Sequence, residues 1–128
     1  MKVLKLDETQ AFFDKSNKKL TLAKTAYSME DYSDAVSLSY YAMFLVAKAL
    51  ILKKGIKPPK THAGLIHLFN THYVKEDDFP YETYKYLAST QAQRETADYD
   101  AIDEINERIA RKRIKQAEEF IEEAERFI

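Results

Sequence analysis

The segment QRETADYD, residues 93–100, contains the residues whose types and spacing most directly suggest chemistry. Arg94 and Asp98 are four positions apart, so they lie on one face of a helix, and Tyr99 follows directly. One interpretation is an ion pair on a solvated surface, worth about 0.3–0.5 kcal/mol. The other is an arginine that a carboxylate holds in place, with its fork of donors presented to phosphate at a cleft or a dimer seam.

The three histidines all lie in THAGLIHLFNTHY, residues 61–73. Successive histidines, His62, His67 and His72, are five positions apart, so no two share a helical face. The spacing of four that is typical of helical zinc pairs is absent, and we expect no metal site. His62 falls in the first turn of a helix that Thr61 can cap, as a hydrogen-bonding residue or a contact for a ligand.

A basic cluster in the last predicted helix is the third candidate. One interpretation is an outer face of ion pairs, because five glutamates follow the cluster and several pairs are four positions apart. Lys112 and Arg113 fit this less well, since they stand where the apolar stripe from Ile105 and Ile109 should continue. The alternative is a basic spot in a cleft or an intersubunit seam that binds phosphate. The cluster comprises Arg108, Arg111, Lys112, Arg113 and Lys115.

The element that must position these residues is a predicted central helix over residues 31–55. Asp31 or Ser33 can cap its start, and Gly55 can end it in a left-handed conformation. A membrane span is rejected because its serines, its tyrosines and Lys48 would be costly in hydrocarbon. Two stripes of residues along this helix predict that it has neighbours on two sides. The first stripe comprises Tyr32, Val36, Ser39, Met43, Val46 and Leu50, and the second comprises the small residues Ala35, Ala42 and Ala49.

The remaining helices are predicted to cover this one. The first spans residues 7–27 and pairs with it as an antiparallel hairpin. A short helix follows Thr61 and ends near residue 73 or 74, the next has Asp78 as its cap, and the last begins near Asp103 as its cap. The predicted inward residues are Phe13, Ser16, Leu20, Ala23 and Tyr27; Leu65, Ile66, Leu68 and Phe69; Tyr84, Leu87, Ala88 and Ala92; and Ile105, Ile109, Ala117, Phe120, Ile121, Ala124 and Ile128.

Composition limits the remaining possibilities. A chain of 128 residues with two glycines and three prolines predicts one all-α domain over residues 1–128. The absence of cysteine excludes disulfides and thiolate chemistry, and fits a reducing cytoplasm. A formal net charge of -1 offers no global attraction for nucleic acid or anionic membranes, so such binding needs a local patch. The first ten residues lack the apolar core of a signal peptide.

Several motifs in combination resemble a known family. They are YYAMF at residues 40–44, AKAL at 47–50, K-T-H at 60–62, and R-x-x-x-D-Y at 94–99. Together they are similar to the HEPN domain. The resemblance implies an antiparallel four-helix bundle with one additional short helix, usually a homodimer, often encoded beside a small nucleotidyltransferase as a toxin–antitoxin pair.

The resemblance also bears on whether the protein is an enzyme. Many HEPN members are metal-independent ribonucleases in which an arginine is followed four to six residues later by a histidine. Arg94 matches the arginine, but Asp98, Tyr99 and Asp100 stand where the histidine is expected. A carboxylate is a poor substitute for imidazole near neutral pH, because its ordinary pKa is far lower.

We therefore expect a cytoplasmic HEPN-like binding or regulatory protein without cofactor, metal or membrane contact. Its site is expected at Arg94, Asp98 and Tyr99, with His62, Lys112 and Arg113 nearby, and its ligand is nucleotide, RNA or the nucleotidyltransferase partner. The first alternative is a divergent ribonuclease that uses Arg94 with Asp98 or Tyr99. The second is a structural dimerisation module without a ligand.

Overall fold

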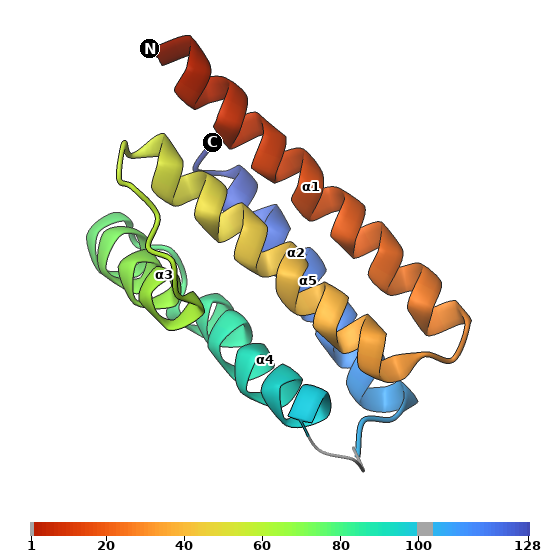
Figure 1. The fold of residues 1–128 in the computed structure, drawn as a ribbon. Coiled ribbons are helices and arrows are strands. Elements are labelled where there is room, and N and C mark those ends of the chain that lie inside the picture. Colours follow the sequence, from red (N-terminus) through yellow and green to blue (C-terminus); the bar gives the residue numbers. More distant parts are fainter. Residues whose placement is uncertain (1, 100–103) are drawn as a thin grey trace.

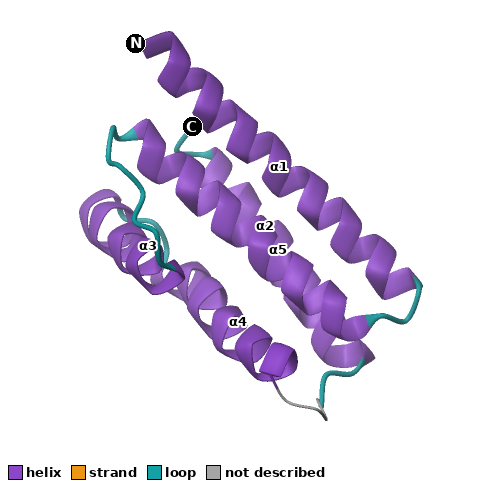
Figure 2. Cartoon of the chain, in the orientation of Figure 1, coloured by secondary structure: helices purple, strands orange, loops and turns teal. Residues whose placement is uncertain are grey.

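The computed structural model describes the backbone of residues 2–99 and 104–128, and the side chains of residues 8–95 and 104–128. These residues form helices and loops only (Figure 2). The predicted all-α class and the bundle with one short additional helix are confirmed (Figure 1). The elements are α1 Lys2–Ser28, α2 Tyr32–Lys53, α3 His62–Phe69, the π-helix η1 Asn70–Lys75, α4 Tyr81–Tyr99 and α5 Glu107–Glu125.

Helix α2 is the centre of the bundle, as predicted. It packs against α1, α3, α4 and α5, and both of its predicted stripes are buried except for the half-buried Tyr32. By length and composition alone α2 could cross a membrane. In this fold the other helices bury 61% of its most apolar stretch, which is the arrangement of a core helix.

Small residues bring α1 close to α2. Ser16 and Ala23 are fully buried on the predicted seam of α1. The Ser16 hydroxyl donates a hydrogen bond of 2.7 Å to the Ala42 carbonyl on α2, which satisfies this buried polar group. Helix α1 extends beyond its predicted range of residues 7–27 at both ends.

The local signals at the ends of α2 and α3 are confirmed. The Asp31 side chain accepts a hydrogen bond from the Asp34 N–H, and Gly55 has a φ of 77°, where a side chain would be strained. The Thr61 hydroxyl accepts from the Gly64 N–H. Helix α3 ends earlier than predicted, at Phe69, because the chain continues as the π-helix η1.

The starts of α4 and α5 differ from the prediction. Asp78 does not cap α4: it has a φ of 58°, and the Pro80 carbonyl accepts the bond from the Tyr84 N–H. Asp103 lies outside the described residues. The α5 cap is Asn106, whose side chain accepts from the N–H three residues later, so the predicted start was wrong.

Two predicted inward residues also point outward. Ala92 on α4 is exposed, and Ile128, beyond the end of α5, is 46% exposed. Ile128 follows the last helical turn, so the helical spacing used to place it no longer applies there. Among the described side chains of α4, Leu87 is buried as predicted, and so is Thr90, whose hydroxyl donates to the Tyr86 carbonyl.

An aromatic cluster closes the end of the bundle where η1 meets the C-terminal part of α5. Phe69 stacks on Tyr73 at 5.2 Å between ring centroids, and its edge contacts Phe79 at 4.9 Å. Phe120 of α5 completes the cluster at 5.6 Å from Phe69. The buried Tyr73 hydroxyl donates to the Leu50 carbonyl, so η1 is fastened to the central helix.

Candidate functional site

Arg94 lies on α4, and its half-buried side chain is held against α2. Its guanidinium carbon is 5.2 Å from the ring centroid of Tyr40 and 5.4 Å from that of Tyr41. Its Nε donates to the Gln91 side-chain oxygen at 3.2 Å, and a terminal nitrogen donates to the Tyr41 hydroxyl at 3.4 Å. Cation–π contacts and hydrogen bonds together restrict the guanidinium to one place.

The first residue of α3 places an imidazole beside this guanidinium. The His62 ring stacks on Phe44 with 4.4 Å between ring centroids, and its Nδ1 is hydrogen-bonded to the Tyr40 hydroxyl at 2.5 Å. Burial, and then the charge of Arg94, lower the pKa of His62 below its ordinary value of 6.5, while Glu95 opposes this. His62 is therefore neutral at neutral pH.

Tyr40 joins the two groups. It is fully buried, and burial raises its pKa, although the nearby Arg94 charge acts in the opposite direction. The phenol therefore remains protonated in the physiological range. One rigid side chain thus contacts both the guanidinium and the imidazole, so neither can move independently of the α2 backbone.

A surface hollow of about 620 Å³ opens between α3 and α4 beside these groups. Arg94 and His62 both line it, together with Tyr84 and the exposed Glu95. The predicted association of Arg94 with His62 is therefore present in the structure. Asp98 and Tyr99, the other predicted members, lie on α4, but their side chains are outside the described residues.

Lys112 and Arg113 do not join this hollow. Lys112 is exposed, whereas Arg113 is 8% exposed and points at α4. Its Nε donates to Gln93 at 2.7 Å, and one terminal nitrogen donates to Ser89 at 2.9 Å and to Gln116 at 3.0 Å. Burial lowers the pKa of Arg113. The basic residue that interrupts the apolar stripe therefore joins α5 to α4, and within one chain it does not line the hollow at Arg94.

The other two histidines do not assemble a metal centre with His62. His67 is exposed at the rim of the hollow, and the Nδ1 of His72 is 3.5 Å from a Glu76 oxygen. Within residues 8–95 and 104–128, no three side chains of the metal-binding types gather around one point.

Sequence reasoning missed Tyr40, Tyr41 and Phe44 as members of the site. In the sequence they stand out only as part of the YYAMF motif of the central helix. The available signal was the pair of adjacent tyrosines, because a tyrosine has an apolar ring for the core and a hydroxyl that needs a polar partner.

Comparison with known proteins agrees with the resemblance found in the sequence. The family model described as the HEPN domain matches residues 9–127. Two Methanocaldococcus jannaschii proteins, each named "Putative toxin", are 32% and 34% identical to this chain; the alignments cover 94% and 91% of it, and 82% and 85% of the relatives. A Thermotoga maritima protein named "UPF0332 protein" is 33% identical over 83% of this chain and 80% of its own length.

Proposed function

We propose, given that this chain belongs to the HEPN domain family, that it is the toxin-type component of a pair with a small nucleotidyltransferase, and that it binds RNA phosphate at Arg94. The family membership and the names of the relatives support the toxin-type role. The pairing, a homodimer and a cytoplasmic location are parts of the same proposal that rest on the family resemblance.

The observation that carries the RNA assignment is the setting of Arg94. A guanidinium held against two aromatic rings at the lining of an open hollow offers a charged fork for phosphate. A structural module without a ligand would instead present a flat surface around Arg94. The hollow of about 620 Å³ argues against that alternative.

A second function, RNA cleavage, is favoured by the position of His62. The imidazole that is absent from the positions after Arg94 is supplied here by α3. If its Nδ1–H donates to the Tyr40 oxygen, Nε2 has a free lone pair. This nitrogen could then take the proton of a ribose 2′-hydroxyl as the 2′-oxygen attacks the adjacent phosphorus, while Arg94 stabilises the charge that develops on phosphate. The bond from phosphorus to the 5′-oxygen breaks, that oxygen takes a proton from water, and a 2′,3′-cyclic phosphate is left.

One experiment with two readouts tests both functions. A labelled single-stranded RNA is incubated with the protein in chelator, and both binding and cleavage are measured for the wild type, Arg94→Gln and His62→Gln. Arg94→Gln should weaken binding roughly 10- to 100-fold, because a charged hydrogen bond to phosphate contributes about 1.5–3 kcal/mol. The control is Arg108→Gln, which removes an exposed arginine from α5 and should bind like the wild type.

The two functions give different results in this experiment. Cleavage by the wild type that is lost in both site variants supports the ribonuclease. Binding without cleavage, lost only in Arg94→Gln, supports a binding role. Equal binding by Arg94→Gln and the wild type, with equal melting temperatures, would overturn the assignment of the site to Arg94.

A further inference from the structure

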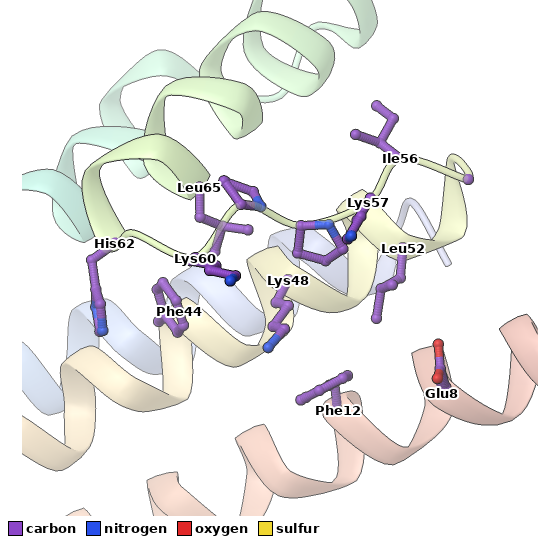
Figure 3. Close-up of a pocket in the computed structure, with 13 residues that line it drawn as sticks. Glu8, Phe12, Phe44, Lys48, Leu52, Ile56, Lys57, Lys60, His62 and Leu65 are labelled. Carbon is purple, nitrogen blue, oxygen red and sulfur yellow. The ribbon is translucent and has the colours of Figure 1, made fainter.

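A second and larger hollow lies on the other side of His62. This groove, of about 760 Å³, runs between α1, α2 and the loop of residues 54–61 (Figure 3). We call it the lysine groove, because Lys48, Lys57 and Lys60 all line it. Figure 3 shows Lys48 and Lys60 pointing into the space that the loop and the helices enclose.

The lysine groove carries a local excess of positive charge. Among the side chains that the structure describes, no carboxylate oxygen lies within 4.0 Å of any of the three ammonium groups. Glu8, the acidic side chain among the described residues of the lining, lies at the end away from His62 (Figure 3). A chain with a net charge of -1 thus places three lysines in one groove, and none of them has an ion-pair partner among the described side chains.

The walls of the groove are partly aromatic. The Lys48 ammonium lies 4.6 Å from the ring centroid of Phe12, and Phe44 forms the wall next to His62. Lysines interleaved with aromatic rings form the combination that binds single-stranded nucleic acid without base-pair readout, since ammonium groups contact phosphates and rings stack on bases.

His62 joins the lysine groove to the hollow at Arg94, because it lines both. Its ring stacks on Phe44 of the groove and is hydrogen-bonded to Tyr40, which also contacts Arg94. A ligand that extends from one hollow to the other must therefore pass His62. A strand of several nucleotides has the length and the repeating charge for this path, whereas a mononucleotide fills one hollow only.

We propose that the lysine groove binds the phosphates of a single-stranded RNA segment that continues past His62 to Arg94. This inference rests on the proposed function, and it specifies the ligand as a strand longer than one nucleotide. The loop of residues 54–61 is then part of the binding surface as well as the connection between α2 and α3.

The test is the salt dependence of RNA binding. A labelled single-stranded oligonucleotide is titrated with the wild type and with the triple variant Lys48→Gln, Lys57→Gln, Lys60→Gln over a range of salt concentrations. Each lost phosphate contact should reduce the slope of log K against log salt by ~0.7, so the triple variant should lose about 2 units of slope. Its affinity at low salt should fall by about tenfold or more. A mononucleotide should bind both proteins equally.

A matched control separates this effect from a change in total charge. The variant Lys18→Gln, Lys24→Gln, Lys115→Gln removes three exposed lysines outside the groove and should retain the wild-type slope. Thermal melting of all variants verifies that they are folded. Poly-glutamate serves as a competitor that carries charge but no bases, and it should displace the RNA poorly.

The outcomes distinguish this inference from the proposed function. If Arg94→Gln loses RNA binding while the groove variant matches its control, the groove assignment is overturned and the function at Arg94 stands. If the wild type binds no RNA, both are overturned. If poly-glutamate displaces RNA as well as unlabelled RNA does, the groove is a general polyanion or acidic-peptide site, and the RNA assignment is overturned.

Discussion

At the scale of single residues, the site depends on His62, whose surroundings disfavour a positive charge on its imidazole. His62 is confined between Phe44 and Tyr40 and lies close to the Arg94 charge. Both burial and Arg94 penalise the imidazolium form, so the folded protein holds this ring neutral at pH values where an exposed histidine is partly protonated.

This lowered pKa predicts a pH dependence of stability. Because the folded pKa of His62 lies below 6.5, the unfolded chain binds more protons between the two values. The wild type should therefore lose stability as the pH falls from about 6.5 through the folded pKa, and should be unaffected by this group at higher pH. Urea unfolding across this range measures the effect.

His62→Gln should remove this part of the pH dependence, whereas His67→Gln, a change at an exposed position, should retain it. Parallel curves of unfolding free energy against pH for the wild type and His62→Gln would show that Arg94 and burial do not penalise the charged imidazole.

At the scale of elements, α4 and α5 are held together by a polar clamp inside an otherwise apolar seam. Arg113 of α5 donates to Gln93 and Ser89 of α4 and also to Gln116 of its own helix, and the guanidinium provides the fork geometry that these bonds require. The adjacent Lys112 is exposed. These two consecutive basic residues therefore have different roles, because neighbouring positions on a helix point in different directions.

Arg113→Lys should destabilise the protein by about 1–3 kcal/mol, because one ammonium at this buried position cannot reproduce the three hydrogen bonds of the guanidinium fork. Lys112→Arg, at the exposed neighbouring position, should change stability by less than about 0.5 kcal/mol. Chemical denaturation of both variants measures the difference. Equal midpoints and slopes would contradict a structural role for the clamp.

The same elements show which features were predictable from sequence. The ends of α2 and the start of α3 followed the prediction because Asp31, Gly55 and Thr61 act through neighbouring backbone groups. The start of α5 did not, because Asp103 and Asn106 are equally good capping types and residue type alone does not choose between them. Likewise, the contact between His62 and Tyr40 joins residues 22 positions apart, and helical spacing within one element does not report on such a contact.

At the scale of the whole molecule, the hollow and the lysine groove place the proposed binding surface on one continuous path across α3, α4 and the loop of residues 54–61. The homodimer of our proposal would double this path, with two Arg94 hollows in one particle. Light scattering on the purified protein should therefore give about twice the chain mass of 14.9 kDa.

Dilution provides the control for that measurement, since a weak association would shift toward the monomer mass as the concentration falls. A monomer mass at every concentration would contradict the homodimer and leave the single-chain site unchanged.

The π-helix η1 has a consequence for the tolerance of this fold to changes in chain length. Its wide turns accommodate Asn70–Lys75 between α3 and the loop before α4 while placing Tyr73 under the Leu50 carbonyl. Deleting one residue before Tyr73 in this segment would turn the following side chains to a different direction around the helix axis relative to α3. Tyr73 would then leave the core. The number of residues in η1 is thus as strict a requirement of the core as the identity of its aromatic side chains.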